Sequence, residues 1–359
     1  MSLLGFDGFT AYANLNDLAN SSNWVRETDN GNAAIVLAGG QNERGGFRVG
    51  GNNRLEEEWY FDIGSLKTEL TIGFWFKFEG FDSTDDLDDI IISFRSSTTY
   101  RASFLLAADG SIQFRRTNTG FEYFDSSDPL ETSTGTPLFL FQGGEYKIEI
   151  KISLINTTGS VELRVDGEQW FINEGGIDAD GTANRVYFET GALFSGASYQ
   201  ISDFWIIEDD GTDPVGFLGQ NFQVELLTPT GESGTESDFT PSSGTDNHLM
   251  VDDGNSHDAD GTYVESTVNT DIDRYTTTDT LNQARVLGVN VISVARHLGS
   301  ADNYRNTIFE NATAGNGGTE ALTESYLPYH YLSTINPDTS AEWDPTDLEG
   351  AEFGVENMA

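Results

Sequence analysis

The chain has 359 residues, no cysteine and a formal charge of −41 at pH 7, with 39 glycines against 8 prolines. Such a negative surface repels phosphate backbones, which argues against nucleic-acid binding. No segment reaches the roughly 18 consecutive apolar residues that a membrane helix needs, and the first residues lack the basic and apolar regions of a classical signal peptide. The length predicts two domains, and without cysteine their stability rests on packing alone.

Short strands separated by turns are expected through the first 210 residues, because apolar and polar residues alternate there with a period of two. In residues 145–155, for example, Tyr146, Ile148, Ile150 and Ile152 share one face, while Lys147, Glu149 and Lys151 face outward. The pattern predicts strands at residues 35–40, 46–51, 59–63, 70–78, 89–97, 102–116, 145–155, 161–170 and 199–211. Asp-Gly pairs within two of these segments indicate hairpin turns, since glycine tolerates the positive φ that such turns require.

Four of these pieces come in an order that resembles the laminin-G-like and concanavalin A-like lectin superfamily. They are LTIGFWFKF (70–78), ASFLLAADGSIQFRR (102–116), the hairpin running from YKIEIKIS to GSVELRVDGE (146–168), and ISDFWIIED (201–209). The resemblance covers roughly residues 5–210 and implies an antiparallel jelly-roll sandwich, which we assign to residues 1–216. Sandwiches of this kind commonly recognise glycans.

The remaining chain changes character. Residues 230–280 are polar and acidic and predict a long loop, whereas residues 285–298 carry apolar side chains on both faces and predict a central strand. Further strands are expected at residues 303–310, 327–334 and 351–355. We therefore predict an all-β protein, with a second and smaller β-sandwich domain in residues 217–359.

This second part resembles a C-terminal region of tailed-bacteriophage virion proteins. The resemblance is carried by FLGQNFQVELLTPTGESG (217–234), DFTPSSGTDNHLMVDD (238–253), VLGVNVISVAR (286–296) and INPDTSAEWDPTDLEGAEFGVE (335–356). It implies a structural protein on the particle exterior, made in the host cytoplasm, as a head decoration, fibre or tail-associated component. Its partners would be capsid or tail proteins and further copies of itself, with a trimer as one expected oligomer. The C-terminal domain would anchor the protein or mediate oligomerisation.

Catalytic signatures are missing from the sequence. Glucanases on this sandwich carry two carboxylates in a Glu-x-Asp-x-x-Glu strand, and the nearest segments, residues 208–213 and 27–32, both lack the final Glu. There is no cysteine and no Gly-x-Ser-x-Gly elbow, and the four histidines are scattered. We predict that the protein is not an enzyme and requires no cofactor.

Calcium is the ion that clustered aspartates fit best, because Ca²⁺ takes six to eight oxygen ligands. The candidate ligands are Asp178 and Asp180 in one Asp-Ala-Asp-Gly segment, and Asp258 and Asp260 in another. Neither segment belongs to a full twelve-residue calcium loop, so we favour solvated turns and keep calcium as the alternative.

Three functions remain from this reasoning. The first is a virion structural protein that acts through assembly contacts. The alternative is a glycan-binding adhesin that recognises a host cell-surface polysaccharide, with aromatic residues such as Trp75 available to stack on sugar rings. Packing explains most aromatic residues equally well, so none is assigned as a sugar ligand. A glycan hydrolase is a distant third.

Overall fold

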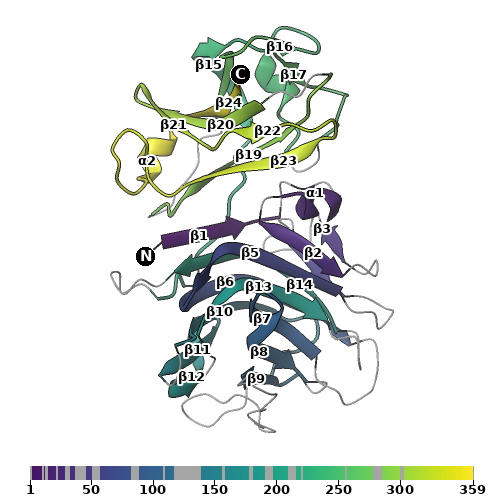
Figure 1. Ribbon diagram of the computed structural model, residues 1–359, viewed down its shortest axis with the longest axis vertical. Helices are drawn as coiled ribbons and strands as arrows, with labels where there is room; N and C mark the ends of the chain where they lie inside the picture. The colour runs from purple at the N-terminus through teal and green to yellow at the C-terminus, as the bar shows by residue number, and fades with distance from the viewer. Residues whose placement is uncertain are drawn as a thin grey trace. The chain divides into compact units, whose positions relative to one another are not determined.

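The structure of the chain is a computed structural model with two compact units, one formed by residues 1–10 and 23–224 and the other by residues 11–22 and 225–359 (Figure 1). The residues that it describes are 2–9, 12, 15–21, 23–28, 33–36, 46–50, 57–81, 89–107, 110–116, 139–155, 158–177, 181–190, 197–208, 216–219, 221–254, 257–277, 285–299 and 303–358. Helix is limited in these residues to α1 (Leu15–Ala19), α2 (Pro345–Leu348) and the 3-10 turn η2 (Asn247–Met250). None of them is long and apolar enough to cross a membrane.

The first unit contains two antiparallel sheets. The eight-stranded sheet has the order β12 (Glu168–Ile177), β11 (Gly159–Val165), β10 (Glu145–Ser153), β6 (Glu69–Phe81), β14 (Ala197–Glu208), β4 (Gly46–Val49) and β3 (Ala34–Val36), with β1 (Ser2–Asp7) also paired to β14. The six-stranded sheet has the order β2 (Trp24–Thr28), β5 (Glu57–Lys67), β13 (Ala183–Thr190), β7 (Asp89–Ser96), β8 (Thr99–Leu106) and β9 (Ile112–Arg116).

An aromatic core joins the two sheets. Trp24 of β2 is 1% exposed, and its ring lies 5.4 to 6.0 Å from the rings of Phe47, Phe61, Phe188 and Phe204, which come from four other strands. Aromatic side chains bury large apolar areas, and tilted or edge-on pairs add roughly 0.5–1.5 kcal/mol each. The alternation predicted for β6 and β10 is confirmed, because every second residue of each strand enters this core.

Tyr199 joins the sheets through polar contacts as well. Its ring, fully buried, projects inward from β14, and its hydroxyl lies 2.9 Å from the carbonyl oxygen of Ile91 and 3.1 Å from that of Glu189. Both carbonyls belong to the opposite, six-stranded sheet. A side chain of one sheet therefore bonds to the backbone of the other in the apolar interior, where an unmade hydrogen bond is costly.

The second unit is built around a six-stranded antiparallel sheet with a two-stranded ribbon packed on it. The sheet has the order β15 (Pro229–Ser237), β18 (Ile272–Thr277), β24 (Glu352–Met358), β20 (Asn303–Glu310) and β21 (Thr313–Asn316), with β22 (Glu320–Ala321) also paired to β20. The ribbon consists of β19 (Val289–Ala295) and β23 (Leu327–Ser333). A further short pair consists of β16 (Thr240–Pro241) and β17 (Val264–Glu265). Ile308, Trp343, Leu348 and Ala351 form a small core, against which Val291 of β19 packs. The predicted all-β fold with a smaller second β-domain is confirmed.

Three expectations for the second unit need correction. Residues 230–280 contain β15 to β18 instead of one long loop, because polar residues form strands there without an apolar alternation that would reveal them. β19 pairs with β23 alone among the described strands, so it is not central, and all its side chains are half-buried. The chain divides between residues 224 and 225, where the sequence predicted 216 and 217, and residues 11–22 group with the second unit.

We expect Tyr199→Phe to lower the free energy of unfolding by about 1–2 kcal/mol, because two buried carbonyls lose a hydrogen-bond donor and the ring stays in place. Urea titration followed by circular dichroism measures the change. Tyr146→Phe is the matched control, since the Tyr146 hydroxyl only accepts from the exposed backbone N–H of Phe141. Equal losses in the two variants would mean that the inter-sheet bonds add nothing.

Candidate functional site

The face of the six-stranded sheet that points away from the core, here called the outer face, carries polar side chains in three cross-strand rows. In the first row Arg185 of β13 pairs with Arg95 of β7 and with Asp62 of β5. In the second, Tyr187 pairs with Tyr60 and with Ser93, and in the third Glu189 pairs with Glu58. Two arginines are thus opposed in one row and two glutamates in another, and like charges in such positions destabilise a sheet unless they find other partners.

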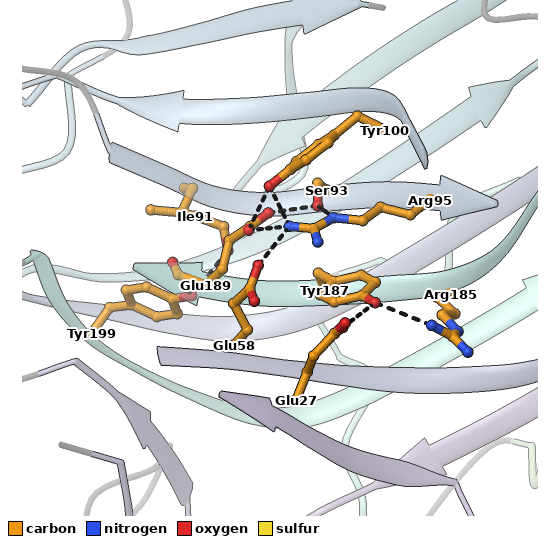
Figure 2. A network of polar contacts seen from close by, with 10 residues as sticks. All are labelled: Glu27, Glu58, Ile91, Ser93, Arg95, Tyr100, Arg185, Tyr187, Glu189 and Tyr199. Atoms are coloured by element: carbon orange, nitrogen blue, oxygen red, sulfur yellow. Dashed lines mark hydrogen bonds and ion pairs between the residues drawn. The ribbon is translucent and has the colours of Figure 1, made fainter. Parts of the chain in front are cut away.

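The side chain of Arg95 resolves this conflict (Figure 2). It extends along β7 toward the glutamate row, where its Nη2 contacts Glu189 and lies 3.1 Å from Glu58. Its Nε donates to Ser93 Oγ at 3.0 Å, and Ser93 donates in turn to Glu189 Oε1 at 2.5 Å. The Tyr100 hydroxyl completes the group by donating to Glu189 Oε2 at 3.2 Å. One guanidinium therefore pairs with two carboxylates.

Aromatic rings enclose the two arginines. The guanidinium carbon of Arg95 lies 3.8 Å from the centre of the Tyr100 ring and 3.7 Å from that of Tyr187, so Arg95 is sandwiched between them. The Tyr187 ring lies 4.8 Å from the Tyr60 ring, over which Arg185 is stacked at 4.4 Å. Cations over aromatic faces gain about 0.5–2 kcal/mol, more when water is excluded. The result is a continuous stack across β8, β7, β13 and β5.

A second chain of bonds leaves this stack toward the sheet edge. The Tyr187 hydroxyl donates to Glu27 of β2 at 2.5 Å and accepts from Arg185 at 3.3 Å, as Figure 2 shows. Arg185 is half-buried and Glu27 is exposed, whereas Arg95, Ser93 and Tyr187 are almost fully buried. The stack is therefore closed at the Arg95 end and reaches solvent at the Arg185 end.

Burial controls the protonation of these groups. It raises the pKa of Glu189 to about 7, an increase that the Arg95 guanidinium and the Ser93 hydroxyl limit. Burial also raises the pKa values of Tyr100 and Tyr187, so both phenols stay protonated and act as donors. A carboxyl group with such a pKa suits general acid–base chemistry. Here, however, both of its oxygens are bonded to Arg95, Ser93 and Tyr100, so the arrangement fixes the face instead of presenting a catalytic group.

The predicted calcium ligands are only partly described. Asp178 and Asp180 lie outside the described residues. Asp258 accepts from the backbone and hydroxyl of Thr262, and Asp260 is held by Arg296 at 2.6 Å and by the Tyr326 hydroxyl at 2.9 Å. Within the described part of the chain, no three acidic or histidine side chains gather as a metal site requires. Calcium binding at these aspartates stays a prediction.

The other sequence candidates are also accounted for. Glu208 pairs with Lys67 at 2.5 Å, and Glu27 belongs to the stack, while residues 209–213 and 29–32 of the two segments lie outside the described residues. His248 contacts Glu232 at 3.0 Å instead of being a free loop residue. Trp24 and Trp59 are core residues, so neither can stack on a sugar.

The sequence reasoning missed the strand that organises this site. Residues 183–190 read ANRVYFET, in which Val186 and Phe188 alternate with Arg185, Tyr187 and Glu189. That period-2 pattern of apolar and polar residues is a strand signal, and it would have placed the three polar residues on one face. Tyr100, by contrast, enters the site through a bulge between Phe94 and Arg95 that no pattern indicates.

No protein-family description and no curated protein sequence matches this chain. Similar solved structures include a sialidase (14% identity, TM-score 0.43, covering 64% of this chain but only 22% of the sialidase). They also include the cellulose-induced protein Cip1 (12% identity, TM-score 0.39, covering 52% of this chain and 91% of Cip1). A third is lectin II from Ulex europaeus (7% identity, TM-score 0.32, covering 52% of this chain and 92% of the lectin). All three TM-scores lie below 0.5, so the function of this chain has to be argued from its own residues.

Arg95→Met is expected to lower the free energy of unfolding by about 3–5 kcal/mol, because it leaves the buried Glu189 and the half-buried Glu58 without a cation. The double variant Arg95→Met/Glu189→Leu should lose less than the sum of the single variants, with a coupling above about 1 kcal/mol. Chemical denaturation of the unaltered protein, the two single variants and the double variant measures this coupling. The exposed pair Arg285 and Glu342 is the matched control, with an expected coupling below that value. Additive losses at Arg95 and Glu189 would contradict the network.

The contribution of His330 to the stability of the second unit should fall as the pH drops from about 6.5 to about 4. Burial lowers the pKa of His330 from 6.5 to about 4, so between these values the unfolded chain binds a proton that the folded chain does not. The loss amounts to at most about 3 kcal/mol. Unfolding titrations at pH 4.5 and 7, with His330→Asn as the control that flattens the dependence, measure it. Identical pH slopes in the two proteins would assign the effect elsewhere.

Proposed function

We propose that the first unit is a non-enzymatic glycan-binding module and that the outer face of the six-stranded sheet is its binding surface. The observation that carries the proposal is the stack of Tyr100, Arg95, Tyr187, Tyr60 and Arg185. The guanidinium and carboxylate groups at its exposed end suit the hydroxyls of sugars. The stack is held rigidly, which lowers the entropic cost of binding.

Its exposed end supplies the contacts. The half-buried Arg185 supplies a cation there, and the exposed Glu27 and half-buried Asp62 offer acceptors beside it. The buried end supplies rigidity, because Arg95 and the two carboxylates bond to one another and not to a ligand. That division of roles supports binding and speaks against catalysis, for which an acid or base would have to reach the substrate.

The role as a virion structural protein stays a prediction from the sequence. The virion assignment rests on the sequence resemblance of residues 217–359, and the contacts within the two units do not bear on it. It stays a prediction, together with a homo-oligomer, capsid or tail partners and a place on the particle surface. A glycan-binding first unit is compatible with that placement, since an adhesin on a particle does both.

Arg185→Ala is expected to weaken glycan binding about tenfold, because it removes the most accessible cation of the stack. A glycan array with the full chain identifies a ligand, and isothermal titration calorimetry compares the proteins. Arg285→Ala, an exposed arginine of the second unit, is the matched control and should bind as the unaltered protein does. Retained affinity in Arg185→Ala would place the site elsewhere, and release of shortened glycan during the titration would overturn the non-enzymatic assignment.

A further inference from the structure

The outer face of the eight-stranded sheet is also buried, although its side chains are polar. Lys147 and Glu149 of β10 point away from the core, as the sequence predicts, yet they are 0% and 1% exposed. Trp75, Gly73 and Thr71 of β6 stand opposite Lys147, Glu149 and Lys151 in the register. Trp205 of β14 is opposite Gly73, and its ring occupies the space that a side chain at position 73 would need, with atoms 2.3–2.4 Å from an ideal Cβ.

A short segment of the chain's own backbone covers this face. Residues 216–219 and 221–224, here called the strap, lead from the sandwich toward the second unit and form no strand. The Phe222 ring packs on Trp205 at 5.7 Å, and the Lys147 ammonium lies 5.2 Å from the Phe222 ring. The backbone N–H of Gly219 donates to Glu149 Oε1, and that of Val224 donates to Asp203 Oδ1, each at 2.8 Å.

The strap leaves several polar atoms beneath it unsatisfied. In the described part of the chain, Lys147 Nζ, Glu149 Oε2, Thr71 Oγ1 and the indole nitrogens of Trp75 and Trp205 are buried without a hydrogen-bond partner. Buried polar groups in native proteins are nearly always bonded, so such a concentration on one face calls for an explanation. Burial also lowers the pKa of the Lys147 ammonium to about 8, although the Asp203 and Glu149 carboxylates act to raise it.

The composition of this face selects the class of molecule that would satisfy it. The Glu149 and Asp203 carboxylates would repel an anion, and the Lys147 ammonium would repel a cation. An apolar ligand would leave the same polar atoms without hydrogen bonds, at a large cost in free energy. A neutral polyhydroxylated molecule fits all of them. Its hydroxyls accept from the ammonium and the indole N–H groups and donate to the carboxylates, while a sugar ring stacks on Trp205.

We propose that this face is a second saccharide-binding site and that the strap occupies it as an internal substitute for the ligand. The strap places an aromatic ring on Trp205 and two N–H donors on the carboxylates, which are the contacts that a stacked sugar and its hydroxyls would make. Its Phe222 ring lies over the Lys147 ammonium, but it gives no hydrogen bond to the ammonium or the indole nitrogens, and a sugar gains those bonds when it displaces the strap. The site is independent of the outer face of the six-stranded sheet.

Displacement of the strap is what the experiment detects. The apparent affinity of a ligand falls in proportion to the fraction of molecules whose site is open. A change that loosens the strap raises this fraction and should therefore strengthen binding. Phe222→Ala in the full chain removes the ring from Trp205 and is expected to bind a neutral hexasaccharide of glucose, mannose, galactose or xylose at least tenfold more tightly than the unaltered protein. Titration followed by tryptophan fluorescence and calorimetry measures this. Phe309→Ala, another phenylalanine stacked with a cation, is the matched control and should change nothing.

Two further measurements identify the surface. Saturating sugar should speed hydrogen exchange at the Gly219 and Val224 amides of the unaltered protein, because the strap leaves their acceptors. Lys147→Met in the Phe222→Ala background should lose at least tenfold in affinity with the thermal midpoint unchanged or raised, whereas Arg185→Ala there should keep the gain. The proposal is overturned if Phe222→Ala binds no hexasaccharide more tightly, if the amides keep their protection, or if Arg185→Ala alone abolishes the gain.

Discussion

The outer face of the six-stranded sheet depends on one guanidinium. The register of β5, β13 and β7 opposes two glutamates in one row and two arginines in another, an arrangement that repels in both rows. Arg95 turns both repulsions into attractions by leaving its own row and reaching the glutamates. The tyrosines then hold its flat group from both sides. Without that cation, nothing would compensate the cost of burying the carboxylates, and the ring stack would lose the group that it packs against.

The two outer faces of the sandwich bury charge in different ways. On the six-stranded sheet, side chains satisfy one another, so that the network is closed and rigid. On the eight-stranded sheet, the cover is a piece of irregular backbone with two N–H donors and one ring, which leaves an ammonium and two indoles unsatisfied. The closed side-chain network suits a fixed surface. The backbone cover suits a contact that a ligand with more hydrogen bonds can displace.

Much of the fold follows from alternation in the sequence, and much of the site does not. β6 and β10 were predictable because their apolar residues recur at every second position. The same alternation placed Lys147 and Glu149 on the outward side, but their burial depends on residues about 70 positions later in the chain. The Arg95 network depends on register, which the bulge between Phe94 and Arg95 in β7 shifts in a way that local patterns do not reveal. The strands of residues 230–280 are polar on both faces and so carry no periodic signal.

The membership of residues 11–22 in the second unit has a consequence for how the protein is made. Tyr12 is fully buried there, with its ring 6.3 Å from that of His330, and α1 touches β23. Its binding partners are more than 300 residues later in the chain. This segment therefore cannot complete its packing until β23 has been synthesised. The chain passes from the first unit into the second and back, so the second unit completes its fold only when residues 11–22 and residues 225–359 are both present.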